Sequence, residues 1–262
     1  MEGSGRRTWG RGLGVAIVAS ARAEIVFLEI LFALLGVIQV RAADTVLASV
    51  QARVGAVRAL SASPDGSYLE KTGNCLLWTV GDGTYTIADL HTLMTGEKGA
   101  SDRVADQIVV QVGKASSRAM LVWPPPGRRD VHKVDMAILE LEQGTVGQPF
   151  GPEVFPHRDG GLPKELYLAA PGHRAGILQI KAPAVAYGSQ WFIYRELSHG
   201  DSGGMVFALE GGEIVPHGFV SSIGALPGEA TRGTAMYGRD AMRTFVNQFL
   251  EAQAGRRLAS RP

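Results

Sequence analysis

Gly200-Asp201-Ser202-Gly203-Gly204 is the stretch of this 262-residue chain that says most about its fold and chemistry. A serine hydroxyl is a weak nucleophile at neutral pH, so it needs a neighbouring base and N–H donors for the oxyanion that it creates. Glycines let the backbone turn sharply, so the N–H groups of Gly200 and Ser202 can point into one small space. The alternative is an ordinary Gly-rich turn, in which Asp201 and Ser202 bond to their own backbone. A base and an acid elsewhere in the chain decide between the two.

The composition is that of a globular protein rich in turns. The chain is 45% hydrophobic, and its net charge of +1 favours neither nucleic acid nor a membrane surface as a partner. Thirty-four glycines and thirteen prolines are spread without a period, which indicates short strands and an all-β fold. The one cysteine, Cys75, excludes an intramolecular disulfide, and its apolar neighbours predict an inert buried thiol.

Residues 1–43 differ from the rest of the chain. Several arginines precede an apolar run from Ile25 to Val40, and Val40-Arg41-Ala42 offers small residues for cleavage. We predict a signal peptide or a membrane anchor through residues 25–40, and therefore a secreted or membrane-anchored protein. Glu29 interrupts the run, and a carboxylate in the centre of a bilayer is energetically unfavourable. An amphipathic helix packed on the domain is the alternative.

From Asp44 onward the chain alternates short apolar runs with turns, which predicts strands. We expect residues 44–150 to form one β unit and residues 151–253 a second. The second unit ends in a helix that begins at Asp240, and residues 254–262 form a tail. The expected strands are Cys75–Val80, Thr84–Leu90, Gln107–Val112, Ala119–Trp123, Leu166–Ala170, Gly176–Lys181, Trp191–Tyr194, Met205–Leu209 and Ile214–Ser221.

His91 and Asp135 are the candidates for the base and the acid. Among six histidines, His91 follows the run Tyr85–Leu90, which predicts a buried strand with His91 at its end. Asp135 has apolar neighbours, so its carboxylate needs a hydrogen-bond partner. A histidine Nδ1–H is such a partner, and the pair fixes the tautomer that a base needs. Taken alone, His91 could be a satisfied or exposed histidine, and Asp135 an aspartate facing solvent.

The order His91, Asp135, Ser202 and the surrounding residues resemble the trypsin/chymotrypsin-like serine protease family, roughly from Gly73 to Leu250. The segment Gly200–Gly204 carries the most specific match. The other matching segments are Thr86–His91, Asp135–Leu139 and Gly218–Ser221.

The resemblance implies two antiparallel β-barrels with a C-terminal helix, preceded here by the hydrophobic leader. It implies a catalytic triad of His91, Asp135 and Ser202, and an oxyanion hole made by the N–H groups of Gly200 and Ser202. No cofactor or metal ion is expected, and the expected partner is a polypeptide substrate.

The chain also departs from the animal digestive enzymes of this family. No Ile-Val-Gly-Gly activation sequence occurs, so we expect no new N-terminus to pair with Asp201. The family's disulfides are absent as well. These features resemble bacterial and viral members, and they leave an intracellular or viral polyprotein context open.

The resemblance also implies which residues line the substrate pocket. Glu196 falls at the pocket base, which implies a Lys or Arg side chain before the cleaved bond. His199 would instead favour an acidic side chain, and Ile223 could block the entrance. Ser221 stands where the family's serine supports the aspartate.

Two classes of function follow from the sequence. One is a serine endopeptidase, and the other is a catalytically silent protease-like domain that binds a peptide or protein. The retained His91, Asp135 and Ser202 favour the enzyme, since a binding module needs none of them. An α/β-hydrolase is disfavoured because its histidine would follow the serine.

Overall fold

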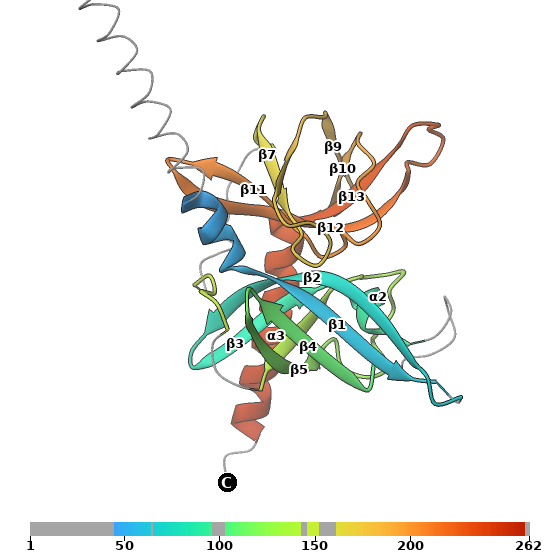
Figure 1. Ribbon diagram of the computed structural model, residues 1–262, viewed down its shortest axis with the longest axis vertical. Helices are drawn as coiled ribbons and strands as arrows, with labels where there is room; N and C mark the ends of the chain where they lie inside the picture. The colour runs from blue at the N-terminus through green and yellow to red at the C-terminus, as the bar shows by residue number, and fades with distance from the viewer. Residues whose placement is uncertain (1–44, 64, 96–102, 143–145, 152–160, 260–262) are drawn as a thin grey trace, which may run out of the picture. The chain divides into compact units, whose positions relative to one another are not determined.

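The computed structural model describes residues 45–63, 65–95, 103–142, 146–151 and 161–259 (Figure 1). The chain divides into Met1–Val46 and Leu47–Pro262. The predicted leader, residues 1–43, lies outside the described residues, so export or anchoring through it stays a prediction. Within the described ranges, no helix has the length and apolar character needed to cross a membrane.

The first half of Leu47–Pro262 forms a closed antiparallel barrel in the order β1-β2-β3-β6-β5-β4 (Figure 1). Its side chains alternate between the interior and the outside, as on β4, where Ile108, Val110 and Val112 are buried. The predicted hairpin joins β2 and β3 at Gly81, whose φ is +56°. The strands are β1 Val54–Ala62, β2 Tyr68–Val80, β3 Gly83–Ala88, β4 Gln107–Val112, β5 Ala115–Trp123 and β6 Ala137–Leu141.

The second half forms a seven-stranded antiparallel sheet in the order β8-β7-β11-β12-β13-β10-β9. Its core contains fully buried Leu168, Ile193, Val206 and Met236. The strands are β7 Leu166–Ala169, β8 Ile177–Ile180, β9 Ala184–Tyr187, β10 Gln190–Ile193, β11 Met205–Glu210, β12 Glu213–Ala225 and β13 Arg232–Gly238.

Helix α3, Arg239–Ala259, follows β13 directly and is longer than the predicted helix. Its buried Phe249 packs against the first barrel, with ring centroids 5.3 Å from Tyr85 and 6.3 Å from Trp78. The helix therefore joins the two halves, because it starts at the second sheet and packs on the first barrel (Figure 1).

The predicted all-β fold with two β units and a C-terminal helix is confirmed. The predicted boundary at residue 150 falls between β6 and β7. The sequence pattern does not reveal β9 or β13. In β13 the reason is Gly233: a Cβ there would lie 2.2 Å from Ile193 O, so close pairing with β10 requires a residue that disfavours strands.

Candidate active site

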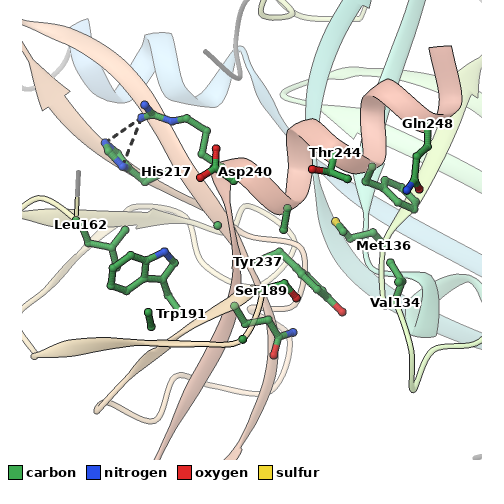
Figure 2. Close-up of a pocket in the computed structure, with 18 of the residues that line it drawn as sticks. Val134, Met136, Leu162, Ser189, Trp191, His217, Tyr237, Asp240, Thr244 and Gln248 are labelled. Atoms are coloured by element: carbon green, nitrogen blue, oxygen red, sulfur yellow. Dashed lines mark hydrogen bonds between the residues drawn. The ribbon is translucent and has the colours of Figure 1, made fainter. Parts of the chain in front are cut away.

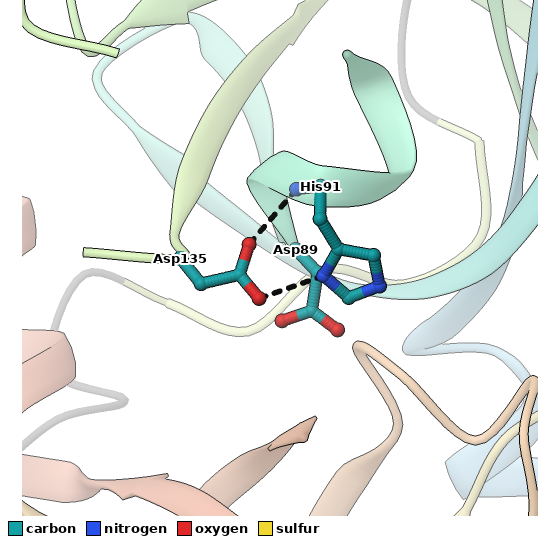
Figure 3. A group of neighbouring side chains, drawn as sticks. All are labelled: Asp89, His91 and Asp135. Carbon is teal, nitrogen blue, oxygen red and sulfur yellow. Dashed lines mark hydrogen bonds and ion pairs between the residues drawn. The ribbon is translucent and has the colours of Figure 1, made fainter. Parts of the chain in front are cut away.

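His91 and Asp135 form a hydrogen-bonded pair at one end of the closed barrel (Figure 3). The Nδ1–H of His91 donates to Asp135 Oδ2 at 2.7 Å, and the backbone N–H of His91 donates to Oδ1 at 2.8 Å. A carboxylate only accepts hydrogen bonds, so it selects the tautomer with the proton on Nδ1 and leaves Nε2 as an acceptor.

The topology explains why these two residues meet. His91 lies in α2, Leu90–Leu93, directly after β3, and not at the end of the strand itself as predicted. Asp135 lies just before β6. Because β3 and β6 are antiparallel neighbours, with Ala88 opposite Ala137, the residues beyond these paired ends lie side by side.

The second sheet supports Asp135. The backbone N–H of Asp135 donates to the Tyr237 hydroxyl at 2.9 Å, and Ser221 Oγ donates to Asp135 Oδ2 at 3.5 Å. Burial raises the pKa of Tyr237, which keeps that hydroxyl neutral. Asp135 therefore contacts groups from both halves of the fold.

Ser202 lies in the loop before β11, and Asn74 of β2 holds this loop. Asn74 Nδ2 donates to Gly200 O at 2.9 Å and to Ser202 O at 2.8 Å, and the backbone N–H of Asn74 also donates to Ser202 O. Asn74 Oδ1 accepts from the N–H of Gly172 at 2.7 Å. With 1% of its surface exposed, Asn74 is a buried connector between the halves.

Two glycines are required by the path of this loop. Gly203 has φ +75°, and a Cβ there would lie 2.0 Å from Asn74 O. Gly200 has φ +96°, and a Cβ there would lie 2.9 Å from Nδ1 of His173. The N–H groups of Gly200 and Ser202, which are the predicted oxyanion donors, donate to no described residue.

Asp201 has an internal cationic partner. Its carboxylate is fully buried and accepts from Nε of Arg174 at 2.8 Å and from Nη2 of the same guanidinium. The N–H of Ser198 adds a third bond at 2.9 Å. The sequence indicates no partner for Asp201, and this bidentate pair supplies one.

No hydrogen bond joins the side chains of Ser202 and His91 among the described residues. The segments that carry these two residues both approach Gly73. A Cβ at Gly73 would lie 2.9 Å from Oγ1 of Thr92, the residue after His91, and 3.4 Å from Ser202 O. The structure thus brings the loop that carries Ser202 beside α2.

No protein-family model and no curated protein sequence matches this chain. Among solved structures, the chain is similar to an inactive form of Rv3671c from M. tuberculosis H37Rv that carries a serine-to-alanine substitution, with 17% identity and a TM-score of 0.50. The match covers 79% of this chain and 90% of that one. The fold is chymotrypsin-like. A second structure, of Rv3671c protease in an inactive form, has 20% identity and a TM-score of 0.47, and covers 77% of this chain and 91% of that one.

His91 and Asp135 follow and precede strands of the closed barrel, and Ser202 lies in the loop before β11 of the second sheet. The predicted pocket residues differ in exposure. Glu196 has a side chain that is 45% exposed and paired with Arg232 at 3.2 Å, so it is not a buried carboxylate. His199 is exposed, while Ile223 on β12 is half-buried.

A pocket of about 670 Å³ lies beside the neighbours of Asp135 in the sequence (Figure 2). Its walls include Val134 and Met136 on one side and Trp191 and His217 on another. None of the predicted site residues lines it. Tyr237, which accepts the hydrogen bond from Asp135, is shared between the pocket and the candidate site.

Two further buried residues of the first barrel, Cys75 and Asp89, have side chains that could be reactive or bind a metal ion. Cys75 is buried, as predicted, and burial raises the pKa of its thiol to about 12, which disfavours a reactive thiolate. Asp89 joins His91 and Asp135 in a group whose possible metal-ligand atoms lie within 4.8 Å of one another. His91 Nδ1 and Asp135 Oδ2 are only 2.7 Å apart, whereas ligands about 2.0 Å from a tetrahedral zinc ion lie about 3.3 Å apart. A metal ion would therefore break this hydrogen bond, and the group does not fit one as it stands.

Proposed function

We propose that this protein is a serine endopeptidase that hydrolyses peptide bonds through an acyl-enzyme. The observation that carries the proposal is the double hydrogen bond from His91 to Asp135 (Figure 3). It holds the imidazole in one orientation and leaves Nε2 able to take a proton.

In the first half of the proposed reaction, Ser202 Oγ attacks the carbonyl carbon of the scissile peptide bond. The Oγ–C bond forms while the hydroxyl proton passes to His91 Nε2, and Asp135 stabilises the resulting imidazolium. The N–H groups of Gly200 and Ser202 stabilise the oxyanion. His91 then protonates the amine nitrogen, the C–N bond breaks and the amine product leaves.

In the second half, water attacks the acyl group on Ser202 and gives a proton to His91. The tetrahedral intermediate collapses, the proton returns to Ser202 Oγ and the carboxylic acid product leaves. The absence of a Ser202–His91 hydrogen bond is compatible with this route, because such bonds are often long without substrate and shorten when it binds.

The hydrogen bonds that hold the loop of Ser202 support the enzyme over the silent binding domain. Asn74 holds the Gly200 and Ser202 carbonyls from one side, and Arg174 holds Asp201 from the other. Catalytic geometry needs such support, whereas peptide binding alone does not require a fixed serine.

Cleavage after Lys or Arg is the finer proposal and depends on Glu196. Arg232 competes for this carboxylate, because the two are paired at 3.2 Å and exposed. A substrate cation would have to replace Arg232 as the partner of Glu196. His199 supports the alternative preference for an acidic side chain.

A peptide library tests both the activity and the preference. The full-length protein is incubated with peptides that carry Lys or Arg, Glu or apolar residues at the varied position, and the products are identified by mass spectrometry. We expect cleavage by the wild type and none by Ser202→Ala. Glu196→Gln is expected to remove a preference for Lys or Arg. Peptide binding without cleavage would favour the silent domain, and cleavage with no Lys or Arg preference would refute the role of Glu196.

A further inference from the structure

Asp89 is a buried carboxyl group beside the His91–Asp135 pair (Figure 3). Only 1% of its surface is exposed, and it lies between β3 and α2. It occupies the N-cap position of α2, but its side chain makes no capping hydrogen bond. Neither of its carboxylate oxygens has a hydrogen-bond partner among the described residues. Such an arrangement needs an explanation, because buried polar groups are nearly always hydrogen-bonded.

The groups around Asp89 make their described hydrogen bonds to other partners. His91 directs both its Nδ1–H and its backbone N–H to Asp135. The backbone N–H of Gly203 lowers the pKa of Asp89, but by less than burial and Asp135 raise it. This N–H donates its hydrogen bond to Val220 O at 2.9 Å. The other groups of this cluster bond to Asp135: Ser221 Oγ donates to Oδ2, and the Tyr237 hydroxyl accepts from the backbone N–H.

The two carboxyl groups therefore have opposite environments. Asp135 accepts three hydrogen bonds, which stabilise a negative charge. An ionised Asp89 would be a second carboxylate near the first, buried and without a donor, which is strongly unfavourable. A protonated Asp89 avoids the repulsion and offers an O–H that Asp135 can accept. Burial and the charge of Asp135 raise the pKa of Asp89 well above its ordinary value.

We propose that Asp89 is a positioning residue that holds a proton in the resting protein and directs its O–H at Asp135. The positioning role rests on the proposed function, in which Asp135 orients the base. The presence of the proton does not depend on that function. Known acid pairs in enzymes follow the same rule, in which two neighbouring carboxyl groups share one negative charge.

A proton on Asp89 makes the stability of the folded protein depend on pH. The pKa of Asp89 is raised in the folded state, so folding takes up a proton wherever the unfolded chain has already lost it. The stability from Asp89 is fully present below its unfolded pKa of about 3.9, and it is lost as pH rises toward the folded pKa. An asparagine at this position does not titrate. Asp89→Asn should therefore gain stability relative to the wild type as pH rises above about 4.

Thermal unfolding of the full-length protein between pH 4 and pH 8 tests this proposal. We expect Tm of Asp89→Asn minus Tm of the wild type to increase by about 3 °C per pH unit while native Asp89 keeps its proton. Asp82→Asn, in the exposed turn between β2 and β3, is the control and should show no such trend. A difference that does not change with pH, or that grows as pH falls, would overturn the proposal.

The rate of labelling by a fluorophosphonate probe tests the positioning role. Asp89→Ala removes the O–H donor and is expected to slow labelling of Ser202 at least tenfold. Asp89→Asn replaces the donor with an amide N–H and should restore most of that rate. Equal labelling of Asp89→Ala and the wild type would refute positioning. An unlabelled wild type would refute the proposed function, while the pH trend in Tm would still report whether Asp89 holds a proton.

Discussion

Asp135→Asn is expected to lower kcat/KM for peptide hydrolysis by about 10⁴-fold without unfolding the protein. Asn Oδ1 can still accept the backbone N–H of His91, which Asp135 accepts at 2.8 Å. The Asn Nδ2 group cannot accept the Nδ1–H, so the ring takes the other tautomer and its Nε2 carries the proton. Nε2 then cannot take the proton of Ser202. Steady-state kinetics with a peptide substrate measure the loss, and circular dichroism checks the fold.

A second histidine–carboxylate pair provides the matched control. His217 Nε2 lies 2.8 Å from Glu210 Oε1, on β12 and β11, and neither residue belongs to the candidate site. Glu210→Gln is a change of the same kind as Asp135→Asn and is expected to leave kcat/KM within about threefold of the wild type. Equal activity of the two variants would contradict the role given to Asp135.

Arg174→Ala is expected to lower the free energy of unfolding by about 3–5 kcal/mol. Its guanidinium is the cationic partner of Asp201, whose side chain is fully buried. Without Arg174, the Asp201 charge keeps only the N–H of Ser198 as a donor among the described contacts. The loop that carries Ser202 should then shift, because Asp201 precedes Ser202. Urea denaturation measures the stability, and fluorophosphonate labelling measures the effect on the loop.

Two further variants separate this effect from the loss of an ordinary ion pair. Arg58→Ala breaks an exposed pair with Glu70, which should contribute little to stability because solvent screens the attraction. In Arg174→Ala/Asp201→Asn the unpaired charge is gone, so part of the lost stability should return. A loss in Arg174→Ala no larger than in Arg58→Ala would show that Asp201 does not need its cation.

The fold was largely predictable because its strands have regular apolar patterns. β4 has the predicted bounds, Gln107–Val112, since its buried residues alternate with outward-facing ones. β13 was not predictable, because Gly233 is required by the close approach of Ile193 O and Gly238 by the Trp191 ring, and no local pattern shows these contacts. Helix α3 was predictable from its apolar face, and its continuation to Ala259 was not.

The candidate site was predictable where a residue has local signals. Ser202 lies among glycines, and Asp135 lies among apolar residues. Asn74, Arg174 and Asp89 gave no such signal, because their importance comes from contacts with distant segments. Asn74 and Ser202, for example, are separated by 128 positions in the sequence. Sequence spacing cannot show such a contact without the fold.

Labelling of the full-length protein with a fluorophosphonate probe tests the serine mechanism most directly. An activated serine reacts covalently with the probe, and tandem mass spectrometry of the digested protein identifies the modified residue. We predict one adduct, on Ser202, and none in Ser202→Ala or His91→Ala. A well-folded wild-type protein that remains unlabelled would contradict the mechanism and favour a silent domain that binds peptides.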